Sequence, residues 1–69
     1  MVTGNLINEH KVMCVKELSV YLGVHPSTVY RMLKRRELPA FKVGADWRFN
    51  IESIDRWRLE QEQKMTSAV

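Results

Sequence analysis

The sequence predicts a small α+β domain built from about three helices and one β-hairpin. Its 69 residues are enough for one domain with a single core. Apolar residues recur at helical spacing over residues 15–35 and again after residue 50, whereas residues 40–50 alternate apolar and polar side chains as strands do. The 45% apolar share favours a folded chain over a disordered one.

Two short helices separated by a tight turn are predicted after a brief apolar strand or lead-in, "KVMCV". The first helix should run from about Val15 to Leu22 and end at Gly23, because glycine enters the left-handed backbone conformation without steric cost. The second should begin at Pro26, whose fixed φ suits the first helical position. It should end near Arg35, since the "ELP" that follows cannot continue a helix.

A β-hairpin is predicted for residues 40–50, with residues 44–46 as a three-residue loop. In that register Val43 pairs with Trp47 and Phe41 pairs with Phe49, so that both pairs face the core.

The same register places Lys42 opposite Arg48 on the outer face of the hairpin, where like charges destabilise a sheet by roughly a few tenths of a kcal/mol. A phosphate between them would explain the pair. The alternatives are that both side chains extend into water or that Asp46 serves as their counter-ion.

A third helix is expected after Asn50, a plausible N-cap, with Ile51, Ile54 and Trp57 as its apolar stripe. Along the whole chain we expect a flexible arm at residues 1–10, the folded domain at 11–62 and a frayed tail at 63–69.

The net charge of +3 is modest, but the cations are concentrated in the middle of the chain. Residues 25–48 carry six cations against two anions, whereas residues 49–69 carry three cations against four anions. A positive middle segment suits an anionic partner such as nucleic acid, and an ordinary solvated surface is the simpler alternative.

The paired helices also match the packing pattern of a helix-turn-helix unit, in which a small residue lies where the helices cross and glycine lies in the turn. Ser19 and Gly23 fill these two roles, and the apolar packing positions are Leu18, Leu22, Val24, Val29 and Met32. The face of the second helix opposite Val29 presents polar and basic side chains that reach base edges and phosphates: Ser27, Arg31 and Lys34, flanked by Thr28, Tyr30 and Arg35.

Over roughly residues 12–58 the chain resembles the excisionase-type winged helix-turn-helix domain, which is related to MerR-type DNA-binding domains. The resemblance rests on "YLGV-x-PSTVYR", "LPAFKVG", "WRF" and "IDRW" in this order. It implies a recognition helix in the major groove, carried here by Ser27, Thr28, Tyr30 and Arg31. It also implies a wing along the DNA backbone or minor groove, carried by Lys42 and Arg48.

Three residues depart from the family pattern. Cys14 stands where a Thr or Ser helix cap is usual, Arg36 replaces a frequent Gly after the second helix, and Asp46 occupies a wing tip that is usually basic or neutral. If Arg36 has a positive φ, the cost is about 1 kcal/mol.

Other chemistries find little support. His10, Cys14 and His25 are too few and poorly spaced for a structural zinc site, and His25 is expected instead at the cap of the second helix, close to a phosphate. No phosphate-binding Gly-rich loop and no carboxylate pair with a pocket is present in the sequence, so neither catalysis nor a cofactor is expected. The chain has no membrane-length apolar run and no signal-peptide pattern, which predicts a cytoplasmic protein.

The predicted function is sequence-specific binding of double-stranded DNA, as an excisionase-like recombination accessory factor or a small transcriptional regulator. Expected partners are DNA, a recombinase or integrase, and further copies of the chain on adjacent sites, with no membrane partner. The alternative is a protein-interaction module that docks through the acidic third helix, using Glu52, Asp55, Glu60 and Glu62.

Overall fold

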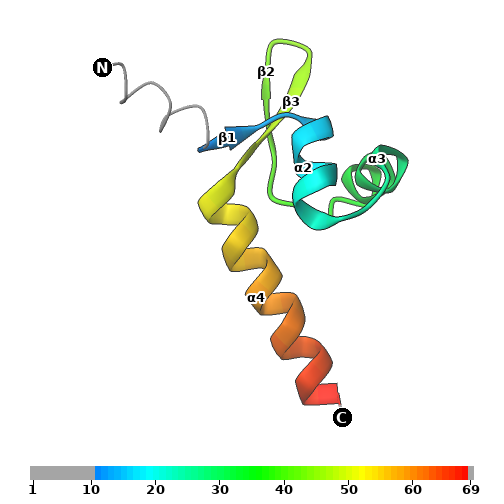
Figure 1. Ribbon diagram of the computed structural model, residues 1–69, viewed down its shortest axis with the longest axis vertical. Helices are drawn as coiled ribbons and strands as arrows, with labels where there is room; N and C mark the ends of the chain where they lie inside the picture. The colour runs from blue at the N-terminus through cyan, green and yellow to red at the C-terminus, as the bar shows by residue number, and fades with distance from the viewer. Residues whose placement is uncertain (1–10, 69) are drawn as a thin grey trace.

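The computed structural model describes residues 11–68 and forms one α+β unit (Figure 1). Its elements in chain order are β1 (Val12–Met13), α2 (Val15–Leu22), α3 (Pro26–Lys34), β2 (Phe41–Val43), β3 (Asp46–Asn50) and α4 (Ile51–Ala68). The predicted class, a small winged helix-turn-helix, is confirmed. The arm expected at residues 1–10 lies outside the described residues.

The turn between α2 and α3 begins at Gly23, as predicted. Gly23 caps α2 with a φ of 73°, and the Val24 amide donates back to the Ser19 carbonyl at 2.9 Å. At the start of α2, the Cys14 amide donates to Glu17 Oε1 at 2.9 Å, so the helix is capped although Cys14 replaces the usual hydroxyl residue.

Arg36 follows α3 with a φ of 58°, in the left-handed region that the missing glycine would occupy without strain. Its amide donates to the Leu33 carbonyl and the Glu37 amide donates to the Met32 carbonyl, both at 3.0 Å. These two bonds close the helix C-terminus. The expected cost of about 1 kcal/mol for a side chain at this φ therefore applies.

The three strands form one antiparallel sheet in the order β1-β3-β2, but the hairpin register differs from the predicted one. Phe41 pairs with Arg48, Lys42 with Trp47 and Val43 with Asp46, which leaves a two-residue loop of Gly44 and Ala45. Two-residue hairpin loops favour a positive φ in the loop, and Gly44 supplies one of 66°.

A shift of one residue moves every side chain of β2 to the other face of the hairpin relative to β3. Phe49 pairs with Met13 of β1 and is fully buried, whereas Phe41 is 39% exposed. The prediction that Phe41 faces the core was therefore wrong, and so was the prediction that Lys42 lies opposite Arg48.

The core lies where α2, α3, β3 and the start of α4 meet. Ser19 is buried at the helix crossing, and its hydroxyl donates to the Lys16 carbonyl at 2.6 Å. Val24, predicted to pack in the core, is 37% exposed because it follows the left-handed Gly23 and leaves the apolar face of α2. The buried apolar residues are Met13, Leu18, Val29, Leu38, Phe49 and Ile54.

Helix α4 is longer than expected. It continues through residues 63–68, for which a frayed tail was predicted, because no Gly or Pro interrupts the sequence from Ile51 to Ala68. Its first turns pack Ile54 and Trp57 against the core, and the rest extends away from the body in Figure 1. Among the described residues, no helix is long and apolar enough to cross a bilayer.

A polar contact ties α4 to α2. The Tyr21 hydroxyl donates to Asp55 Oδ1 at 2.5 Å, and Arg58 Nη2 donates to the same oxygen at 3.0 Å. The Arg58 guanidinium also lies 5.3 Å from the centre of the Tyr21 ring. The Tyr21 hydrogen bond is the main reason that the pKa of Asp55 lies below its ordinary value.

We expect Tyr21→Phe to lower the melting temperature at neutral pH by a few degrees at most, because the contact is exposed to solvent. A carboxyl whose pKa is lowered by folding contributes stability above its unfolded pKa and loses it as the pH falls through its folded pKa. The difference between the two proteins should therefore vanish in acid. Thermal melts at neutral and acidic pH check this, and a difference that persists in acid would assign the effect to ring packing instead.

Candidate functional site

The exposed face of α3 carries most of the predicted DNA-contacting residues. Val29 is fully buried, which turns the opposite side of the helix to solvent. On that side Ser27, Arg31 and Lys34 are exposed, and Tyr30 and Arg35 are exposed beside them, whereas Thr28 is half-buried. The structure therefore brings these predicted residues together on one helix.

The N-terminus of α3 is capped by His25, as expected. His25 Nδ1 accepts a hydrogen bond from the Ser27 amide at 3.1 Å and lies 2.9 Å from the Ser27 hydroxyl. Pro26 occupies the first helical position. The cap leaves an exposed imidazole at the positive end of the helix dipole, a position that suits a nearby phosphate.

Arg31 lies one turn into α3 and is supported by its own helix. Its Nη2 donates to Thr28 Oγ1 at 3.4 Å, a long hydrogen bond that biases the guanidinium toward one direction. Thr28 and Arg31 are thus in contact on one side of α3. Arg31 is exposed, so its remaining donors are accessible from solvent.

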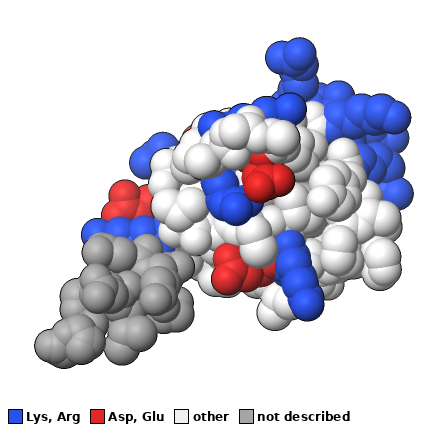
Figure 2. All heavy atoms as spheres, turned by 90° about the horizontal axis from the view of Figure 1, so that it is seen from above, with Lys and Arg blue, Asp and Glu red and all other residues white. Residues whose placement is uncertain are grey.

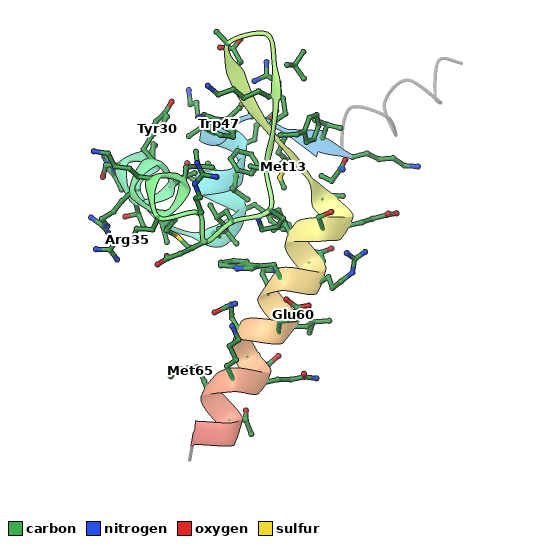
Figure 3. The ribbon with its side chains drawn as sticks, turned by 180° about the vertical axis from the view of Figure 1, so that it is seen from behind. Met13, Tyr30, Arg35, Trp47, Glu60 and Met65 are labelled. Atoms are coloured by element: carbon green, nitrogen blue, oxygen red, sulfur yellow. The ribbon has the colours of Figure 1, made fainter. Side chains whose placement is uncertain are left out.

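A groove of about 540 Å³ lies between α3 and Trp47 of the hairpin. In Figure 3, Tyr30 and Trp47 lie beside each other at this junction, whereas Arg35 lies at the far end of α3. Four predicted residues line the groove, Ser27, Tyr30, Arg31 and Lys34, and they are joined there by Leu33 and Trp47.

The corrected hairpin register places the two wing cations on different faces. Lys42 lies across from Trp47, and its Nζ is 4.9 Å from the centre of the indole ring, a cation–π contact. Arg48 donates to its neighbour's carbonyl, Trp47 O, at 2.8 Å, and lies 4.0 Å from Asp46. The expected repulsion between Lys42 and Arg48 does not arise, and Asp46 is the counter-ion of Arg48 alone.

The charge of the surface follows this arrangement. Figure 2, seen from above, shows Lys and Arg side chains gathered on the right, the side on which Figure 1 places α3. Arg31, Lys34, Arg35 and Arg36 are the exposed cations of this region. One face of the molecule is therefore positive, as an interface with a polyanion requires.

The acidic residues of α4 do not form a matching docking face. Asp55 is bonded to Tyr21 and Arg58 within the chain. At 3.6 residues per turn, Arg56 lies between Glu52 and Glu60 around the helix. Cations therefore interrupt the surface on which the alternative function depends.

Sequence reasoning missed the part that Trp47 and Leu33 take in the groove. Trp47 was expected only to face the core, against which it does pack, and Leu33 was given no role. No local signal indicated this role, because it depends on how the hairpin packs beside α3; the Gly44-Ala45 turn accounts only for Lys42 lying across from Trp47.

Comparison with known proteins gives one match. A family model described as a helix-turn-helix domain matches residues 12–62, which cover every element from β1 to the middle of α4. No curated protein and no solved structure matches the chain.

Proposed function

Since the chain belongs to the helix-turn-helix domain family and such domains bind DNA, we propose that it recognises duplex DNA with α3 in the major groove. The β2–β3 hairpin then acts as the wing and meets the DNA backbone. The observation that carries this proposal is the exposed polar and basic face of α3, continuous with a groove that the hairpin closes on one side.

Each residue in this interface has a role set by its position. Arg31, supported by Thr28, reads a base edge, since its guanidinium can form two hydrogen bonds to guanine. Ser27 and His25 lie at the N-terminus of α3, where amides and the helix dipole favour a phosphate. The remaining cations, Lys34, Arg35, Lys42 and Arg48, contact the backbone.

The biological role that fits a domain of this size is accessory and non-catalytic. It is either an excisionase-like factor that shapes DNA for a recombinase or integrase, or a small transcriptional regulator. A single domain buries about 600–1,000 Å² on DNA, which supports binding of several copies to adjacent sites. The cytoplasm is the expected compartment, and a free Cys14 fits its reducing conditions.

We expect affinity for duplex DNA to depend strongly on salt. If Arg31, Lys34, Arg35, Lys42 and Arg48 each neutralise a phosphate or lie close to one, the slope of log affinity against log salt should be about −3 to −5. Lys42→Ala should make this slope shallower by about one unit. Fluorescence anisotropy with a labelled duplex over a salt series measures it.

Arg56→Ala is the matched control, because Arg56 is an exposed cation on α4 away from the groove between α3 and the hairpin. It should leave the slope unchanged. A slope near zero for the unmodified protein would contradict DNA binding, and an absence of binding even at low salt would favour the protein-interaction alternative.

A further inference from the structure

The groove between α3 and the hairpin is unusual in a face made for a polyanion, because its walls are chiefly apolar. Tyr30, Leu33 and Trp47 form these walls, and Arg31 and Lys34 stand beside them with Ser27. Tyr30 is 55% exposed, a large aromatic side chain turned to solvent beside the residue proposed to read a base. A phosphate contact gives no reason for an aromatic wall here.

The major groove of DNA contains one kind of apolar group that an apolar protein surface can contact. Base edges present hydrogen-bond donors and acceptors, and the C5-methyl group of thymine is their only apolar group. We propose that the groove lined by Tyr30, Leu33 and Trp47 receives a thymine methyl group, against the Tyr30 ring, next to the base pair that Arg31 reads. This inference rests on the proposed function and adds a second recognised base to it.

The position of Tyr30 on α3 supports this assignment. Tyr30 immediately precedes Arg31, so its side chain leaves the helix on the flank of the reading face. That flank faces the hairpin, because Tyr30 and Trp47 line the same groove (Figure 3). A base adjacent to the one that Arg31 reads therefore lies within reach of the Tyr30 ring.

The opposite wall is held in place before any DNA arrives. Trp47 is half-buried against the core, its strand pairs with β2, and the Lys42 ammonium lies over its ring. Lys42 is thereby kept beside Trp47, where it can meet a phosphate of the bound DNA. A preformed wall reduces the ordering cost of binding.

The decisive experiment removes only the methyl group. A duplex selected by the protein from random sequences serves as the cognate site, and each thymine in it is replaced in turn by deoxyuridine. At one position the affinity should fall about fourfold, the factor that corresponds to about 0.8 kcal/mol for one buried methyl group. The other replacements should have little effect.

Variants then assign the methyl group to the groove. In Tyr30→Ala the thymine and deoxyuridine duplexes should bind equally, whereas Tyr30→Phe keeps the ring and should keep the fourfold difference. Val20→Ala, on the exposed side of α2 and 76% exposed in the native chain, is the matched control and should also keep it. Arg31→Ala should lose affinity and still respond to deoxyuridine.

Two results would overturn the inference while leaving the proposed function intact. One is a cognate duplex on which no deoxyuridine replacement matters. The other is a Tyr30→Ala variant that weakens both duplexes equally while the difference between them persists, which would mean that the ring packs on the sugar–phosphate backbone. If the native chain selects no sequence from the random pool, the proposed sequence-specific function fails, and this inference fails with it.

Discussion

Arg31→Ala should weaken binding to the cognate duplex by about 1–3 kcal/mol and relax the preference at one base pair. The guanidinium is the group on the exposed face of α3 best suited to a two-point contact with a base edge, because its planar fork matches the two acceptors of guanine. The Arg31 guanidinium donates a hydrogen bond to the Thr28 hydroxyl, one turn earlier in the helix, so the Arg31 side chain has already lost part of its conformational freedom in the unbound protein. Binding to random DNA should change much less.

Lys34→Ala is the matched comparison, because it separates the loss of a phosphate contact from the loss of base recognition. Lys34 lies one turn further along the same exposed face and also borders the groove, but its ammonium is a point charge suited to phosphate. Its removal should weaken cognate and random duplexes by similar factors. Titrations of both variants on both duplexes measure these effects, with thermal melts to verify folding. If Arg31→Ala also lost equally on both DNAs, Arg31 would contact only the backbone.

The helices were predictable because their boundaries are set by local chemistry. Gly23 adopts the left-handed conformation that ends α2 without steric cost. Pro26 has no backbone N–H, so it fits the first position of a helix, where an N–H would have no partner within the helix. Neither choice depends on residues far away in the chain. The exposed face of α3 follows directly from the buried position of Val29, so the helix residues that face solvent could be predicted from spacing alone.

The hairpin register could not be predicted in the same way. Apolar and polar residues alternate on both sides of Gly44, and this alternation favours a three-residue loop, because that loop places the apolar residues of both strands on one face. The structure has a two-residue loop instead, in which Phe41 lies across from Arg48 and Lys42 lies across from Trp47. The alternation alone therefore does not determine how the two strands pair.

The error in register had a consequence for the candidate site. With Lys42 and Arg48 placed opposite each other, the wing was predicted as a pair of cations with a phosphate between them. In the structure Lys42 lies over Trp47 at the edge of the α3 groove, while Arg48 is paired with Asp46. The two cations therefore lie on different faces of the hairpin, each with its own partner within the chain.

Phe49→Ala should leave the domain largely unfolded at room temperature. Phe49 is the largest fully buried side chain, and truncation of a buried Phe to Ala costs about 3–5 kcal/mol. A single core of this size rarely supplies more than about 3–5 kcal/mol of net stability, so the loss is comparable to the whole. Circular dichroism should show a loss of helical signal and of a cooperative melting transition.

Phe41→Ala is the matched control, because it removes the same atoms from the neighbouring strand. Phe41 is 39% exposed and pairs with Arg48, so its loss leaves no cavity in the core and should cost about 1–2 kcal/mol, in proportion to its partial burial. For a domain of this length that is a fall of about 5–15 °C in melting temperature, with the cooperative transition retained. In the register predicted from alternation, both phenylalanines face the core and both substitutions should be severe. Equal and large losses of stability in the two variants would therefore support the three-residue loop, whereas a large difference between them supports the two-residue loop of the structure.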